Sequence, residues 1–159
     1  MAMHAELSPV EVADRLAIRE LFDEYARCAD RRDGKRQQAL FTADTRFAVH
    51  MDGEGTEPSY VIEGREGLAP VFDDLGQYEV TTHFNAQSTI ALDGDRASGE
   101  SYTIAHHLFT VDGERMIMIA SLRYRDTFSK IDGAWLFAER ILILDWSETR
   151  PSPSISVAS

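Results

Sequence analysis

The amino-acid sequence predicts an α+β fold, in which N-terminal helices pack on one face of an antiparallel sheet. In the first half of the chain, apolar residues recur at steps of three and four, whereas from Val80 onward the apolar period is two. Asp-Gly pairs then divide the second half into long runs, as in an antiparallel meander; they are Asp93-Gly94, Asp112-Gly113 and Asp132-Gly133. Helices followed by a series of such strands are typical of the α+β class.

The first helix begins with a clear N-terminal signal. Ser8 can cap the helix, Pro9 fits its first position, and Glu11 completes a capping box three residues after the cap. A turn signal at Asp33-Gly34 predicts that the helix ends near residue 31. The apolar stripe between these signals consists of Ile18, Leu21, Phe22, Tyr25 and Ala29.

The next elements are shorter. We expect a second helix over residues 35–41, a strand over 45–50, a loop over 52–59 and a third helix over 64–75, with Pro70 close to its start. Four antiparallel strands complete the domain. The chain of 159 residues is long enough for one domain with one core, which we place at residues 8–148; residues 149–159, rich in Ser and Pro, are expected to be a disordered tail.

Composition excludes several classes of function. The net charge of −11 would repel phosphate backbones and anionic lipid surfaces, so we expect neither nucleic acid nor a membrane as a partner. The single cysteine, Cys28, cannot form an internal disulfide and belongs to no metal-binding motif. No run approaches the roughly 18 apolar residues of a membrane span, and the N-terminus lacks a signal-peptide pattern. We therefore expect a cytoplasmic protein.

Residues 116–120 are apolar at every position, so both faces of that strand must be covered. The helices can cover only one face. A second subunit is the simplest cover for the other, and we expect a homo-oligomer, either a dimer or a trimer.

A carboxylate and an imidazole are the candidate catalytic groups. Asp30 lies in the last turn of the first helix, where the helix dipole disfavours a negative charge. Either this position has a function, or Arg31, Arg32 and solvent offset the cost. His83 shares one strand face with Asn85, and this polar row either faces water or lines a cavity. If the two groups meet, Asp30 can orient His83 as a general base.

Other polar residues have two interpretations each. His106 and His107 are neighbours on a strand and must point to opposite faces, so only one can line a cavity and the pair cannot chelate one metal ion. Arg123 and Arg140 can bind an anionic substrate group, or they can pair with nearby carboxylates. Tyr25 can donate a proton into the site, although it lies on the apolar stripe.

Short segments along the chain, taken in order, resemble one known family. They are Ile18, Leu21, Tyr25, Asp30, Asp33, Leu40-Phe41, Asp44, Gly64-Arg65-Glu66-Gly67, His83, Leu92-Asp93-Gly94-Asp95-Arg96-Ala97, Arg123-Tyr124-Arg125-Asp126, Gly133-Ala134-Trp135 and Arg140. Over about residues 10–146, their order and spacing resemble the SnoaL-like proteins of the NTF2-like superfamily. Lys130 departs from the pattern, because many relatives have arginine there.

The resemblance implies a cone-shaped α+β barrel, with helices packed into the concave face of a curved sheet around a pocket. One branch contains scytalone dehydratase, bile acid 7α-dehydratase and hexachlorocyclohexane dehydrochlorinase. In that branch, an Asp and a His at the positions of Asp30 and His83 pair inside the pocket. By the same resemblance, Tyr25, His106 and Arg140 match or lie near functional positions of the family.

We therefore expect a lyase of the dehydratase type, or an isomerase, that needs no metal or other cofactor and acts on a small hydrophobic cyclic molecule. Asp30 and His83 are the expected catalytic residues. The expected substrate-binding residues are Tyr25, Asn85, Tyr102, His106, Arg123 and Arg140. Two alternatives are a non-catalytic ligand-binding or scaffold protein and the small subunit of a ring-hydroxylating dioxygenase.

Overall fold

Helix α1 (Pro9–Arg31) starts and ends where the sequence predicts. The computed structural model describes residues 6–55 and 57–153. The Ser8 side chain accepts a hydrogen bond from the backbone of Glu11, and the Glu11 carboxylate accepts one from the backbone of Ser8. Arg32 closes the helix in a left-handed conformation with φ of 58°. The predicted apolar stripe is buried.

The short elements differ from the prediction in detail. The second helix, α2, spans Gly34–Ala39, and strand β1 spans Phe41–His50, four residues more than expected at its start. Strand β2 (Tyr60–Glu63) was not predicted, because four residues are too few for a periodic pattern; it forms by pairing with β1. The expected third helix is broken into α3 (Ala69–Asp73) and a 3-10 turn on each side of it.

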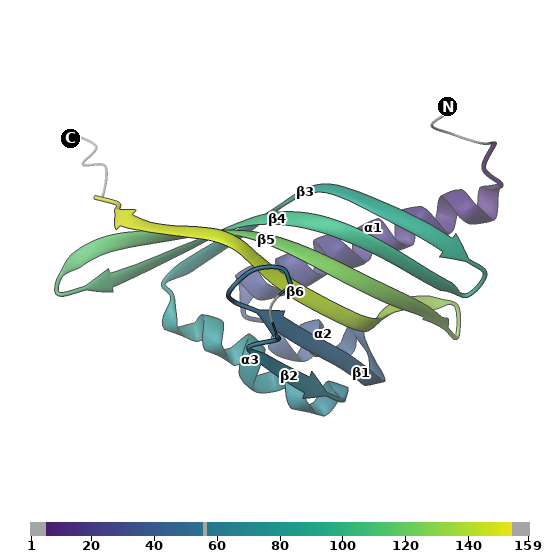
Figure 1. The fold of residues 1–159 in the computed structure, drawn as a ribbon, viewed down its shortest axis with the longest axis horizontal. Helices are drawn as coiled ribbons and strands as arrows, with labels where there is room; N and C mark the ends of the chain where they lie inside the picture. Colours follow the sequence, from purple (N-terminus) through teal and green to yellow (C-terminus); the bar gives the residue numbers. More distant parts are fainter. Residues whose placement is uncertain (1–5, 56, 154–159) are drawn as a thin grey trace.

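Four long strands form the main part of the sheet, as predicted. They are β3 (Val80–Asp93), β4 (Arg96–Val111), β5 (Glu114–Ile131) and β6 (Ala134–Pro151), joined by the three Asp-Gly turns. The strand order is β2-β1-β6-β5-β4-β3, and all pairs are antiparallel except β1 with β6. Strand β3 is therefore an edge of the sheet, and α1 runs beside it (Figure 1).

The helices pack against one face of the curved sheet, which we call the inner face. Aromatic side chains from the helices and from the inner face fill the space between them; they are Phe22, Tyr25, Phe41, Phe47, Phe72, Tyr124, Phe128 and Phe137. The opposite face, which we call the outer face, has no helix over it (Figure 1).

The C-terminal boundary lies further along than expected. Thr149 and Arg150 pair with Met118 and Ile117 of β5, so residues 149–151 belong to the sheet and not to a tail. Backbone hydrogen bonds to β5 extend strand β6 beyond the apolar residues from which the sequence predicted it. Residues 154–159 of the expected tail lie outside the described part of the chain.

Among the described residues, no helix is both long enough and apolar enough to cross a membrane.

Candidate active site

Asp30 and His83 meet at the end of α1, beside the free edge of β3. Nδ1 of His83 lies 2.7 Å from Oδ1 of Asp30, and the backbone N–H of His83 donates to Oδ2 at 3.0 Å. The hydroxyl of Thr81 donates to the same carboxylate at 3.0 Å and accepts from Arg32 at 2.7 Å. A contact between residues 53 positions apart in the sequence is therefore fixed by several hydrogen bonds.

Asp30 lies where its carboxylate can accept a hydrogen bond from the unpaired backbone of edge strand β3. An edge strand leaves backbone groups without partners, and polar side chains of α1 and its C-cap supply them here. Arg15 donates to the carbonyl of Ile90 and Arg19 to that of Ala86, while Asp30 accepts from the exposed-side N–H of His83. These bonds offset the unfavourable dipole at the C-terminal end of α1, which explains why a carboxylate is stable there.

The hydrogen bonds also fix the state of the pair. Burial raises the pKa of Asp30, but hydrogen bonds from the His83 side chain and backbone and from Thr81 outweigh it, and the pKa is lowered overall. An ionised carboxylate only accepts, so the proton between the two residues is assigned to Nδ1 of His83. Nε2 then carries the lone pair, and among the described residues it has no hydrogen-bond partner.

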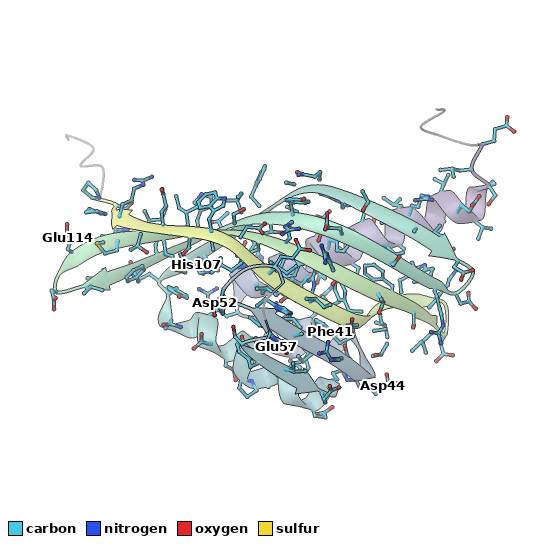
Figure 2. All side chains as sticks on the ribbon, in the orientation of Figure 1. Phe41, Asp44, Asp52, Glu57, His107 and Glu114 are labelled. Atoms are coloured by element: carbon cyan, nitrogen blue, oxygen red, sulfur yellow. The ribbon has the colours of Figure 1, made fainter. Side chains whose placement is uncertain are left out.

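A second histidine lies beside this pair. His107 faces the inner side of the sheet and is buried, and its ring centroid is 5.9 Å from that of His83 and 4.7 Å from that of Tyr78 (Figure 2). Burial, and next the nearby His83, lower its pKa to about 4, so this imidazole is neutral at pH 7. Its Nδ1 is buried and has no partner among the described residues.

Three predicted substrate-binding residues lie elsewhere. Tyr102, His106 and Arg123 point to the outer face, so they cannot line a site shared with His83. Residues paired across strands share a face, and His83 pairs with Ala105, which places every even-numbered residue of β4 on the opposite side. The sequence left open which of the two adjacent histidines faces inward, and the strand register decides for His107.

Two other predicted residues are part of the core. Arg140 is fully buried and forms a two-point ion pair with Asp126, with N–O distances of 2.9 and 3.1 Å. Its guanidinium group also stacks on the rings of Tyr25, Tyr124 and Phe137, 3.8 to 4.2 Å from their centroids. Tyr25 is surrounded by aromatic rings. Both side chains therefore fill the interior in which the resemblance placed a pocket.

Asn85, the remaining predicted residue, lies two positions from His83 on the same strand. Its amide nitrogen donates to the Asp23 carboxylate and to the carbonyl of Phe22, and its oxygen accepts from Thr103. These three bonds fix the side chain between α1 and β4. It can offer little to a substrate without breaking one of them.

The accessible space next to the pair is an open groove between α1 and β3, with a volume of about 430 Å³. Besides Asp30 and His83, it is lined by Arg19, Asp23, Ala26, Arg27, Arg31, Phe84 and Asn85. The lining is mostly charged and polar. Two of its arginines are paired with carboxylates, Arg19 with Asp23 and Arg27 with Glu24.

Comparison with known families decides the relationship. The model of the family described as "SnoaL-like domain" matches residues 10–141, which is most of the chain. The chain belongs to the SnoaL-like domain family. An uncharacterised protein of Mycobacterium tuberculosis is 26% identical over 137 residues, covering 85% of this chain and 88% of the relative.

Solved structures share the NTF2-like fold of this SnoaL-like domain. A putative scytalone dehydratase from Novosphingobium aromaticivorans is 22% identical with a TM-score of 0.73, and 93% of this chain and 97% of that one are covered. A type 2 hexachlorocyclohexane dehydrochlorinase (LinA) is 18% identical with a TM-score of 0.72, and the coverage is 93% and 95%. Identities this low establish the common fold, and the activity of the domain must be argued from its site.

Within the part of this SnoaL-like domain that the structure describes, no three His, Cys, Asp or Glu side chains are arranged to hold a metal ion. At the groove, Asp30 and His83 form the one pair of acid and base among the lining residues that is joined by a hydrogen bond in the described part of the chain.

Replacing His107 with glutamine is expected to make the domain less sensitive to acid. The folded-state pKa of His107 is about 4 and its ordinary value is 6.5, so the unfolded chain binds more protons between these values. The free energy of unfolding then falls as the pH decreases from 6.5 to 4, by up to roughly 3 kcal/mol at 1.36 kcal/mol per pKa unit.

Urea denaturation across that pH range measures the effect. The acid-dependent loss of stability should be smaller in His107→Gln than in the wild type. His106→Gln is the matched control, because it makes the same substitution at the neighbouring residue of β4, on the outer face of the sheet. Equal pH dependence in wild type and His107→Gln would show that His107 does not stay neutral in the folded state.

Proposed function

We propose that this SnoaL-like domain is a cofactor-independent lyase of the dehydratase type, or an isomerase, in which His83 removes a proton from carbon. The observation that carries the proposal is the Asp30–His83 pair, with 2.7 Å between Nδ1 and Oδ1 and a lone pair on Nε2. A carboxylate that holds an imidazole fixes its tautomer and its orientation, which leaves Nε2 aimed as a base.

In the elimination, Nε2 of His83 takes a proton from a carbon next to a carbonyl or another activating group. The electron pair of that C–H bond forms the new double bond, and the leaving group departs with the electrons of its own bond to carbon. A hydroxyl leaves as water after it receives the proton from the His83 imidazolium, whereas a halide leaves without it. In an isomerase, the imidazolium returns the proton to another carbon of the same substrate.

The substrate class in this proposal is a small hydrophobic cyclic molecule with one acidified C–H bond. The structural neighbours support it, because one is described as a putative scytalone dehydratase and another as a hexachlorocyclohexane dehydrochlorinase. His107 lies beside His83 but is buried and does not line the groove, so the proposal gives it no contact with the substrate.

One specific observation favours a second candidate, a ligand-binding or scaffold protein without catalysis. Arg140, Asp126 and the aromatic rings around them occupy the interior of the cone, and the groove beside His83 is open and charged. A site open to water weakens the electrostatic interactions on which proton abstraction depends.

Hydrogen–deuterium exchange at carbon separates the two candidates. The protein is incubated in D₂O with a panel of cyclic ketones and hydroxy-ketones, and deuterium incorporation and dehydration are followed by NMR and mass spectrometry. The lyase or isomerase predicts exchange or elimination that depends on His83. Ligand-induced shifts in protein spectra without any exchange on the panel would favour the binding protein.

A further inference from the structure

A series of hydrogen bonds continues from the Asp30–His83 pair to an arginine behind it. The hydroxyl of Thr81 donates to Oδ1 of Asp30 at 3.0 Å and accepts from Nη1 of Arg32 at 2.7 Å. Oδ1 of Asp30 is also the oxygen that lies 2.7 Å from Nδ1 of His83. The four side chains therefore form one continuous series, which we call the Arg32–His83 series.

The donors and acceptors allow only one direction along the Arg32–His83 series. A guanidinium group has only donors, so Thr81 must accept from Arg32, and its one hydroxyl proton is left for Asp30. Without such a donor, a threonine hydroxyl can turn to a nearby backbone carbonyl instead. Hydrogen bonds that point the same way polarise one another. The positive charge of Arg32 therefore strengthens the bond that Thr81 donates to the carboxylate.

Arg32 is fixed through both its backbone and its side chain. Its backbone ends α1 in the left-handed conformation, with φ of 58°, and its N–H donates to the carbonyl of Ala29 at 3.2 Å. Its guanidinium group donates to the same carbonyl at 2.7 Å and to the carbonyl of Tyr78, shortly before β3, at 3.3 Å. Arg32 thus joins the end of α1 to the start of β3, the two elements that carry Asp30 and His83.

Thr81 is 4% exposed, so water does not readily replace its hydroxyl as a partner of the carboxylate. It lies two positions before His83 on β3, and both side chains therefore point to the same face of the strand. Burial raises the pKa of Asp30, and the bonds from His83 and Thr81 together lower it below its ordinary value. Removing the hydroxyl leaves the carboxylate less firmly held and more basic.

We propose that Thr81 and Arg32 are positioning residues for His83: they hold the Asp30 carboxylate in one orientation and withdraw part of its charge, so that the shared proton stays on Nδ1. The inference rests on the proposed function, in which Nε2 of His83 removes a proton from carbon. The bond made by one ring nitrogen determines the state of the other. Neither Thr81 nor Arg32 lines the groove, so both act through Asp30 and not on a substrate.

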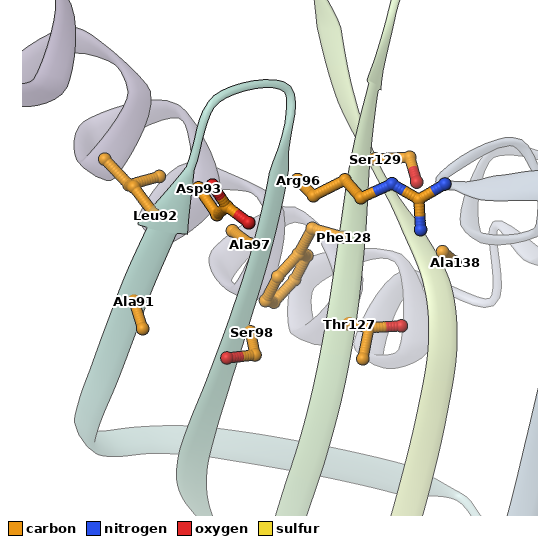
Figure 3. A pocket seen from close by; sticks show the side chains of 10 residues that line it. All are labelled: Ala91, Leu92, Asp93, Arg96, Ala97, Ser98, Thr127, Phe128, Ser129 and Ala138. Carbon is orange, nitrogen blue, oxygen red and sulfur yellow. The ribbon is translucent and has the colours of Figure 1, made fainter.

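A second groove offers a matched control. It lies toward the other end of the strands, and its lining includes Asp93, Arg96 and Thr127 (Figure 3). It thus contains a carboxylate, a guanidinium group and a hydroxyl, but in the described part of the chain no hydrogen bond joins these three. Thr127 is exposed. Thr127→Val therefore makes the same chemical change as Thr81→Val without removing a member of the Arg32–His83 series.

Nitrogen-15 NMR of the full chain tests the proposal without any substrate. Long-range correlations from the carbon-bound ring protons give the chemical shifts of Nδ1 and Nε2, and His83→Asn identifies the signals of His83 by their absence. In Thr81→Val the more basic carboxylate draws the proton away from Nδ1, so the Nδ1 signal should move toward the value of an unprotonated nitrogen. Arg32→Met should move it in the same direction, whereas Thr81→Ser and Thr127→Val should leave it in place.

Kinetics on a substrate found by deuterium exchange give the second readout. Thr81→Val should lower kcat by about 10-fold or more with KM unchanged, because the lost hydrogen bond is to a charged group that no substrate touches. Thr81→Ser should restore kcat. Valine keeps the branched shape of threonine, so the variant should fold, which circular dichroism and the urea midpoint verify; Arg32→Met tests the same series independently.

Two failures are distinguishable. An Nδ1 signal that stays in place in both Thr81→Val and Arg32→Met, or that Thr127→Val moves equally, would overturn the positioning role. A wild type that neither exchanges nor eliminates on the panel of cyclic ketones would overturn the proposed function, whatever the NMR spectra show.

Discussion

Replacing His83 with asparagine is expected to lower turnover by about 10²- to 10⁴-fold while the protein remains folded. The asparagine amide nitrogen can take the place of Nδ1 and donate to Asp30, so the contact between α1 and β3 survives. What the variant loses is Nε2, the only part of the imidazole that the proposed reaction uses as a base. Initial rates on a substrate identified by deuterium exchange measure the effect.

His106→Asn is the matched control for this experiment. It makes the same chemical change on the neighbouring strand but on the outer face, and it should keep the wild-type rate. Full activity in His83→Asn would contradict the assignment of His83 as the base. Loss of activity together with a lower urea midpoint would instead indicate that His83 acts through the fold.

Asp30→Asn tests the second member of the pair. The amide can still accept from the backbone of His83, but it cannot stabilise the imidazolium, and the initial rate should fall. The lowered pKa of Asp30 means that the carboxylate stabilises the folded state above its ordinary pKa and that this contribution is lost as the pH falls.

The second large effect concerns stability. Replacing Arg140 with methionine is expected to lower the free energy of unfolding by about 3–5 kcal/mol, because it leaves the Asp126 carboxylate buried without its partner. Burial already raises the pKa of Asp126 to about 6 against the attraction of Arg140. Urea denaturation at neutral pH measures the loss.

The double variant Asp126→Leu/Arg140→Met should recover most of this loss, since buried ion pairs can often be exchanged for apolar residues of similar volume. Arg46→Met is the surface control: Arg46 pairs with Glu139 on the partly exposed side of the sheet, and its loss should cost less than about 1 kcal/mol. A double variant as unstable as Arg140→Met alone would show that the stacking of Arg140 on the aromatic rings, and not its pairing with Asp126, stabilises the core.

Local signals predicted the elements that depend on local chemistry. The capping box at Ser8 and the three Asp-Gly turns located α1 and the four long strands, because these signals act within a few residues. Strand β2 and the extra residues of β1 were missed, since they exist through pairing with distant strands.

The candidate site was predicted in part. The resemblance brought Asp30 together with His83, and the structure places them in contact. The inward orientation of His107 could not be read from the sequence, because the alternation along β4 has two possible phases and only the register with β3 selects one. The register of the strands also places Tyr102, His106 and Arg123 on the outer face. The stacking of Arg140 in the core could not be predicted either, because the three rings that it contacts come from three different elements.

The double use of Asp30 has a consequence for how such sequences are interpreted. Its carboxylate serves the imidazole, but it also accepts from the backbone of an edge strand that would otherwise be open to pairing with another molecule. The aspartate therefore protects the sheet edge whether or not the pair is catalytic. An Asp at the end of this helix is therefore evidence of a protected sheet edge, and only a histidine with a free ring nitrogen beside it is evidence of an enzyme.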